Sequence, residues 1–197
     1  MVRVVAKITV LSLWLGAGIA GAQAPQIIKG KVLAFTDSLV TVATASGTTK
    51  IALAPDWSMS ISTPITIQQI QPGSKIGTTN IDVPGGGHAT EVHVFPPTAH
   101  GFEGQRTMDS KTGSRMTNGT VGKVVSSANG RELDVSFPGG TRHVQVPADA
   151  LITSVTPADR TLLKPGISVS IAAFQEPGKP PLGRFVSTGP NGAPPAR

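Results

Sequence analysis

Short runs in which apolar and polar residues alternate fill most of the chain beyond residue 26, and turn residues separate these runs. Segment 132–137 shows the pattern most plainly, because its apolar side chains Leu133, Val135 and Phe137 occupy every second position. A period of two residues is typical of a strand with one buried and one solvated face. The pattern therefore predicts a protein built of short strands.

The pattern of the first half of the chain recurs in the second half. Shifts of 92 and 93 residues superpose three pairs of segments: 30–32 on 122–124, 63–64 on 156–157, and 72–73 on 165–166. Apolar positions between these segments also keep their apolar character under the shift. We interpret the pattern as an internal repeat.

Each copy is predicted to contain three strands, one short helix and two further strands. The strands are expected at 27–35, 39–44, 48–53, 75–83 and 90–95 in the first copy, and at 120–126, 132–137, 142–146, 167–174 and 184–188 in the second. Thr-Pro begins the helix at residues 63 and 156, and Pro-Gly ends it. This order of elements is that of an OB-type barrel.

We therefore predict an all-β fold with one short helix per repeat, arranged as two tandem OB-like five-stranded barrels. A pair of open β-sandwich-like sheets is the alternative that the strand count leaves open. The predicted organisation is a signal peptide at residues 1–22, a first OB-like repeat at 25–95, a connector loop at 96–118, a second OB-like repeat at 119–189 and a flexible C-terminal tail at 190–197.

The first 24 residues have the pattern of a secretory signal peptide. Arg3 and Lys7 precede an apolar run at residues 8–20, and small residues follow it at 21–24. The apolar run is shorter than the roughly 20 residues that a helix needs to cross a bilayer. We predict cleavage after Ala22, a periplasmic or secreted location, and no stable membrane anchor after cleavage.

The composition narrows the chemistry that is available. The chain of 197 residues has 23 Gly and 17 Pro but no Cys, which favours a turn-rich β fold and excludes disulfides, cysteine zinc sites and thiol catalysis. The formal net charge of +6 falls to +4 when Arg3 and Lys7 leave with the signal peptide. Since only 4% of the residues are aromatic, the predicted partner is an envelope protein or a small ligand and not a nucleic acid.

Three segments resemble sequences of a known family. They are residues 91–96 (EVHVFP), 101–109 (GFEGQRTMD) and 116–118 (MTN). With the repeat and the signal peptide, they make the chain similar to a family of uncharacterised bacterial envelope proteins with tandem OB-like domains of unknown function. The resemblance implies a histidine at the position of Gln105 and a tryptophan at that of Met108, and this sequence departs from the family at both positions.

Histidines and carboxylates gather between residues 88 and 109 and form a candidate metal site. The candidate ligands are His88, His93, His100 and Glu103. Imidazole and carboxylate groups suit zinc, copper or nickel, so a divalent transition metal is the one cofactor that the sequence suggests. The alternative interpretation is a solvated strand followed by a polar loop.

The connector loop offers a second kind of candidate site. Its charged residues Glu103, Arg106 and Asp109 are the predicted contacts to a ligand or partner protein, because long loops on rigid scaffolds often bind. The sequence has no GxSxG, GKS/T or HExxH motif, and we expect no enzymatic activity. The predicted function is an exported, non-enzymatic binding or accessory protein, and periplasmic metal-ion binding or handling is the alternative.

Overall fold

The computed structural model describes residues 25–99, 103–109, 113–127 and 130–196. These residues form twelve strands and three 3₁₀ turns, and they contain no α-helix. The predicted all-β class is therefore confirmed. The described residues include no helix that is long and apolar enough to cross a membrane, and the predicted signal peptide lies outside them.

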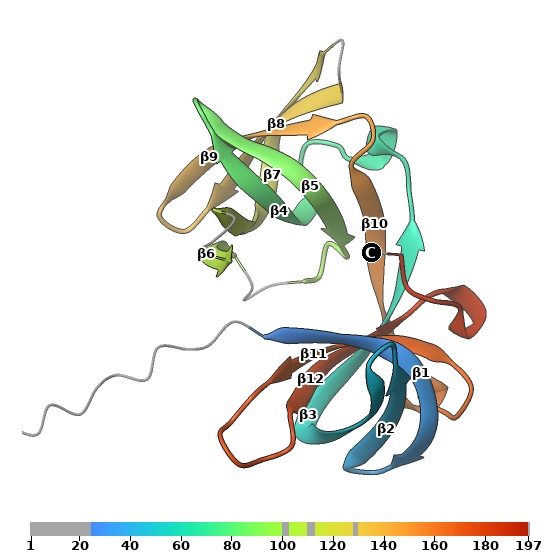
Figure 1. The fold of residues 1–197 in the computed structure, drawn as a ribbon. Coiled ribbons are helices and arrows are strands. Elements are labelled where there is room, and N and C mark those ends of the chain that lie inside the picture. Colours follow the sequence, from blue (N-terminus) through green and yellow to red (C-terminus); the bar gives the residue numbers. More distant parts are fainter. Residues whose placement is uncertain (1–24, 100–102, 110–112, 128–129, 197) are drawn as a thin grey trace, which may run out of the picture.

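Five strands close into a mixed barrel, which lies at the bottom of Figure 1. They are β1 (Gln26–Thr36), β2 (Leu39–Thr44), β3 (Gly47–Pro64), β11 (Ser168–Phe174) and β12 (Leu182–Thr188). Antiparallel pairs join β12, β11, β1, β2 and β3 in that order, and the parallel pair of β12 with β3 closes the ring. The barrel interior is apolar, with Val40, Val42, Ile51 and Ile171 fully buried.

The other seven strands lie outside this barrel. They are β4 (Lys75–Val83), β5 (Gly86–Phe95), β6 (Gly104–Asp109), β7 (Ser114–Ser127), β8 (Gly130–Phe137), β9 (Gly140–Pro147) and β10 (Leu151–Ala158). Strands β5, β4, β7, β8 and β9 are neighbours in that order, and β5 also pairs in parallel with β9 over two residue pairs. They enclose a second apolar core that includes Ile70, Ile76, Leu133 and Val144.

The closed barrel differs from the predicted one in the origin of its strands. The prediction placed all five strands of a barrel within one copy, whereas β1, β2 and β3 come from the first half of the chain and β11 and β12 from the second. The physical reason is the length of β3, which has 18 residues and runs beyond the barrel. It carries the chain to the outer strands, so that β4 and β5 pair with β7 and β9 there.

Strands β3 and β10 form the connection between the two parts. Residues 59–64 of β3 pair antiparallel with residues 153–158 of β10, and Ser62 lies opposite Val155. The first residues of β10 also pair in parallel with β5, from Leu151 opposite Glu91 to Ser154 opposite Val94. Figure 1 shows β10 and the end of β3 running side by side between the barrel and the outer strands.

Some predicted elements are shorter or different in the structure. Each predicted short helix is a single 3₁₀ turn, η1 (Ile67–Gln69) or η2 (Arg160–Leu162). The predicted Thr-Pro starts at residues 63 and 156 are wrong, because these residues still belong to strands β3 and β10, and the Pro-Gly pairs then leave room for one turn only. Part of the predicted connector loop is strand β6, which pairs with β7. Within the predicted flexible tail, residues Pro190–Gly192 form a third 3₁₀ turn, η3.

Engineered cysteine pairs test the exchange of strands between the two halves. Lys31 on β1 lies opposite Ser168 on β11, so Lys31→Cys with Ser168→Cys is expected to form a disulfide within one chain. Opposed residues of an antiparallel pair lie about 4.5–5.5 Å apart at their Cα atoms, which a disulfide can span. Peptide mapping by mass spectrometry detects the bond, and the chain has no other cysteine.

The control for this experiment places the second cysteine at Lys75. A barrel made of consecutive strands would set β4 beside β1, whereas Lys75 pairs with Thr120 of β7. A disulfide between positions 31 and 75, in place of one between 31 and 168, would contradict the exchange.

Candidate functional site

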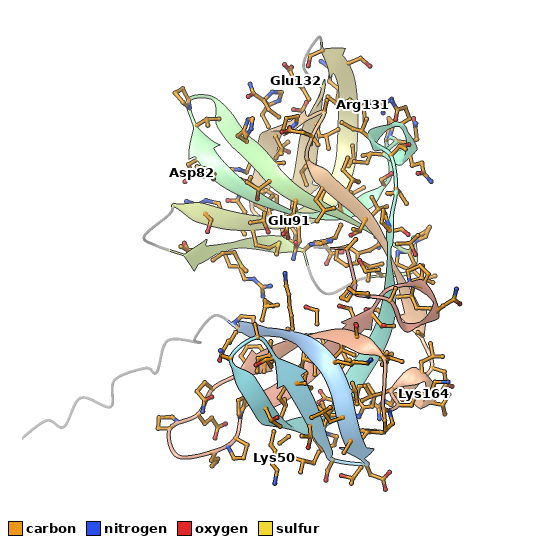
Figure 2. All side chains as sticks on the ribbon, turned by 45° about the vertical axis from the view of Figure 1, so that its right-hand side comes forward. Lys50, Asp82, Glu91, Arg131, Glu132 and Lys164 are labelled. Atoms are coloured by element: carbon orange, nitrogen blue, oxygen red, sulfur yellow. The ribbon has the colours of Figure 1, made fainter. Side chains whose placement is uncertain are left out.

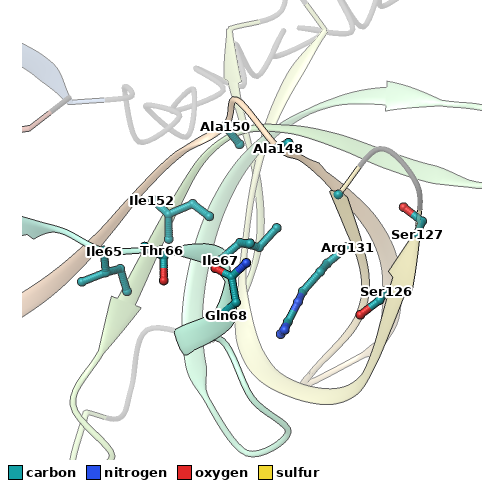
Figure 3. Close-up of a pocket in the computed structure, with 11 residues that line it drawn as sticks. Ile65, Thr66, Ile67, Gln68, Ser126, Ser127, Arg131, Ala148, Ala150 and Ile152 are labelled. Carbon is teal, nitrogen blue, oxygen red and sulfur yellow. The ribbon is translucent and has the colours of Figure 1, made fainter.

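The outer strands form a pocket of about 590 Å³ at the end where η1 lies. It is lined by Ile65, Thr66, Ile67, Gln68, Ser126, Ser127, Gly130, Arg131, Ala148, Ala150 and Ile152. One wall is apolar, and the hairpin that joins β7 to β8 supplies serine hydroxyls and a guanidinium group. Figure 3 shows Arg131 extending from β8 into the space between Gln68 and Ser126.

Arg131 is held in place by the backbone of the segment that follows η1. Its Nη1 donates a hydrogen bond to the carbonyl oxygen of Ile70 at 2.9 Å, and Ile70 is fully buried in the core. A guanidinium group has five N–H donors in a planar fork, so this bond uses only a part of its capacity. Arg131 is the one charged residue among those that line the pocket.

The closed barrel has a corresponding place, which the register of the strands identifies. In the barrel Phe185 and Val186 pair with Ser58 and Met59, and in the outer strands Glu91 and Val92 pair with Leu151 and Ile152. Positions 58 and 151 therefore correspond. One residue earlier, Trp57 corresponds to Ala150.

In the closed barrel, Trp57 fills the place that is open in the outer strands. Its side chain is only 4% exposed. The ring of Phe35 meets it edge to face with 6.1 Å between the centroids, and Cζ of Arg160 lies 4.9 Å from the centre of the indole ring. Such aromatic and cation–π contacts stabilise a buried ring. Ala150 has no ring to fill the equivalent space, and a pocket remains.

The polar side of the pocket belongs to a longer hairpin. The β1–β2 hairpin of the barrel and the β7–β8 hairpin of the outer strands have equivalent residue pairs as far as Thr36 with Leu39 in the first and Val125 with Glu132 in the second. Two residues lie between the members of the first pair and six between those of the second. Four lining residues, Ser126, Ser127, Gly130 and Arg131, are among these six residues.

Away from the pocket, strands β4 and β7 hold a buried polar network that Arg142 of β9 joins. Thr78, Asn80 and Thr117 are fully buried, whereas the corresponding barrel residues Ile171, Ala173 and Ile28 are apolar. The Nδ2 group of Asn80 donates to Thr117 Oγ1 at 3.4 Å, and Gln105 Nε2 donates to the same hydroxyl at 3.2 Å.

Arginines at the edge of this network are already paired within the protein. Arg142 donates from Nε to Asn80 Oδ1 at 3.1 Å and from Nη2 to the Gly86 carbonyl at 3.0 Å, and it also bonds to Asp82. The pKa of the Asp82 carboxyl group lies below its usual value, mainly because Arg115 donates hydrogen bonds to it and, to a smaller extent, because Arg142 does so too. Arg115, Arg142, Asp82 and Asn80 thus pair with one another, whereas the buried hydroxyl of Thr78 has no hydrogen-bond partner among the described residues. We assign the paired groups to the fold and not to a ligand site.

Figure 2 shows that these two features are separate. Asp82 lies near the outer end of the β4–β5 hairpin, and Arg131 lies by the β7–β8 hairpin on another side of the outer strands. No residue of the network lines the pocket. The pocket is therefore the candidate binding site.

The predicted metal ligands do not meet in the described part of the structure. His88 is exposed on β5, whereas His93 contacts Thr153 of β10, with 2.8 Å between Nδ1 and Oγ1. Glu103 directly precedes β6, and His100 lies outside the described residues. Among the described residues no three His, Cys, Asp or Glu side chains are grouped closely enough to hold a metal ion. The metal site stays a prediction from the sequence.

The predicted ligand contacts lie on or beside β6. Arg106 is exposed on this strand, and the side chain of Asp109 lies outside the described residues. Neither Arg106 nor Glu103 is among the described residues that line the pocket. Their role as contacts to a partner also stays a prediction.

The sequence contained a signal for the pocket that the repeat alignment missed. The alignment placed Gly30 on Gly122, but the structure places Gly30 at the position of Gly119, since Val32 pairs with Val42 as Val121 pairs with Val135. A Cβ atom on either Gly30 or Gly119 would lie within 2.2 Å of a backbone oxygen. With these glycines matched, the hairpin extension becomes visible, whereas the change from Trp57 to Ala150 already stands at the shift of 93 residues.

Comparison with protein-family profiles, with curated proteins and with solved structures gives no match for this chain.

Removing the indole ring from the barrel tests its role there. Trp57→Ala is expected to lower the free energy of unfolding by about 3–5 kcal/mol, because it empties a buried site. Urea unfolding measures the change. The control is Phe185→Ala, whose ring is 59% exposed and whose loss is expected to cost less than about 1 kcal/mol. Equal losses in both variants would contradict the packing described for Trp57.

The carboxyl group of Asp82 makes the stability depend on pH. Since its pKa is lowered in the folded state, the carboxylate stabilises the fold above its unfolded pKa of about 3.9, and this stabilisation is lost as the pH falls through the folded pKa. Asp82→Asn is expected to lower the melting temperature at pH 7, with a gap to wild type that closes below about pH 4. Asp56→Asn removes an exposed pair with Arg184 alone and serves as the control. A gap of constant size from pH 7 to pH 2 would contradict the assignment.

Proposed function

We propose that this chain is an exported, non-enzymatic binding protein built from two copies of one OB-like unit, which exchange their last two strands. In this proposal β7, β8, β9, β4 and β5 are the second barrel. The pocket beside η1 is its ligand site, and the ligand is a small molecule.

Matching irregularities in the two sets of strands support the duplication. The register of β1 on β2 shifts between Val32 and Ala34, and that of β7 on β8 shifts between Val121 and Lys123. The register of β11 on β12 and that of β4 on β5 also shift at corresponding places. Bulges are structural features of a fold and rarely coincide without a common origin.

The pairing of β3 with β10 supports the same conclusion. Ser62 and Val155 are opposite each other, and 93 residues separate them. This separation equals the main repeat shift, so equivalent residues of the two copies meet. Such self-pairing is expected at a two-fold axis between two copies of one unit.

The difference between Trp57 and Ala150 is the observation on which the binding function rests. Two similar sets of strands differ most clearly where one is filled by an indole ring and the other holds a pocket of about 590 Å³. This volume is within the range of about 300–1,000 Å³ that is usual for small-molecule sites. The hairpin extension adds donors at the same place, which supports recognition of a ligand.

The residues of the pocket favour binding over catalysis. Arg131 is its one ionisable lining residue, and an arginine does not exchange protons at physiological pH. The lining holds no aromatic side chain for stacking bases, which supports a small ligand over nucleic acid. Export rests on the signal peptide predicted at residues 1–22 and places the protein in the periplasm or outside the cell.

Filling the pocket tests this function. Ala150→Trp is expected to place an indole ring where Trp57 has one in the barrel, and to abolish binding. Ligand-observed NMR with a mixed panel of small metabolites compares the variant with wild type, and circular dichroism checks the fold. The matched control is Lys50→Trp, which adds the same ring at an exposed position of β3. The proposal predicts at least one compound that binds both wild type and Lys50→Trp but does not bind Ala150→Trp. If the panel contains no such compound, the proposal is contradicted.

A further inference from the structure

We infer that the pocket beside η1 recognises a planar aromatic group that carries a carboxylate, in the class of indole and aryl carboxylic acids. This inference rests on the proposed binding function and specifies its ligand. Two observations support it: what the protein itself places at the corresponding position of the closed barrel, and the unbalanced charge of the pocket.

The first observation concerns shape. At the corresponding place the closed barrel buries an indole ring between an edge contact from Phe35 and a face contact from Arg160. The register places Val124 at the position of Phe35, and Ile67 at that of Arg160. Both replacements are apolar and pack against the second core. Ile67 thus gives the pocket an apolar wall, and neither replacement contributes a ring of its own.

The second observation concerns charge. In the barrel the cation beside the indole ring comes from η2, whereas in the pocket it comes from Arg131 on the extended hairpin. Among the described residues that line the pocket, none is acidic. The neighbouring residue Glu132 is directed to His143 of β9, with 3.7 Å between Oε2 and Nε2. A carboxylate on the ligand would balance the charge of Arg131.

Neutral donors around Arg131 suit a carboxylate as well. Ser126, Ser127 and Gln68 line the same part of the pocket and offer hydroxyl and amide groups. A guanidinium group binds a carboxylate through two parallel hydrogen bonds, which are stronger than those between neutral groups. The ring would lie against Ile67, Ala150 and Ile152, and the acid would face the hairpin.

The comparison also gives the number of sites. Trp57 already occupies the place in the closed barrel, so of these two equivalent places the one in the outer strands is open to a ring. One chain is therefore expected to bind one aromatic acid.

Calorimetric titration of the full chain with three probes tests the inference. Indole-3-acetate has both ring and acid, indole-3-acetamide lacks the charge, and octanoate lacks the ring. Indole-3-acetate is expected to bind wild type one to one, and about tenfold or more tightly than either other probe, because a hydrogen bond to a charged group is stronger than one to a neutral group.

Substitutions at Arg131 separate charge from shape. Arg131→Gln is expected to make the affinities for the acetate and the amide equal within about twofold, and Arg131→Lys to keep a part of the preference for the acid. Arg184→Gln, on β12 of the closed barrel, is the matched control and is expected to bind as wild type does. Thermal unfolding of each variant shows whether the fold is retained.

Three results would decide against the inference. If octanoate binds wild type as tightly as indole-3-acetate or more tightly, the ligand does not need an aromatic group. If indole-3-acetamide binds wild type as tightly as indole-3-acetate, the ligand does not need a carboxylate. Failure of both indole probes, while another compound binds wild type but not Ala150→Trp, would overturn the ligand class and leave the binding function in place. If Ala150→Trp binds every compound as wild type does, the binding function itself fails.

Discussion

The antiparallel pairing of β3 with β10 is the contact on which the rest of the architecture depends. Both strands extend beyond their own sets and pair with each other, so each half of the chain completes the other, and neither set of five strands consists of consecutive strands. β11 and β12 then close the barrel against β1 and β3, and β4 and β5 pair with β7 and β9. The two parts of the molecule are thus linked by hydrogen-bonded strands and not by a loose linker.

This arrangement lets similar sets of strands hold different interiors. The closed barrel has an apolar core that includes Trp57 at its end, so its packing serves stability. The outer strands replace buried apolar residues with Thr78, Asn80 and Thr117, and the hydrogen bonds of Asn80 extend to Thr117 and to the paired Arg142. They also replace the indole with Ala150 and lengthen one hairpin. A stable barrel beside a less completely filled set of strands is a reasonable physical basis for a binding protein, since a ligand can supply the packing that the protein lacks.

Much of the local structure could be predicted from the sequence. Alternation located most of the strands, and Pro-Gly located the ends of the turns at η1 and η2, because both signals depend on residues close together in the chain. The exchange of strands could not be predicted, since β4 and β11 have the same pattern and either can pair with β1. The polar connector hid strand β6, whose pairing with β7 depends on a distant neighbour. The pocket was missed because aligning Gly30 with Gly122 concealed the hairpin extension, and the described ones among the predicted site residues lie elsewhere.

The most direct test of this account is an NMR measurement of intermolecular NOEs between indole-3-acetate and the methyl groups of the protein. The account predicts NOEs from the ring protons to the methyl groups of Ala150, Ile67 and Ile152, which line the pocket, and none to Val40 and Val42 in the closed barrel. Ring NOEs to the barrel methyl groups, or a bound ligand without an NOE to Ala150, would contradict it.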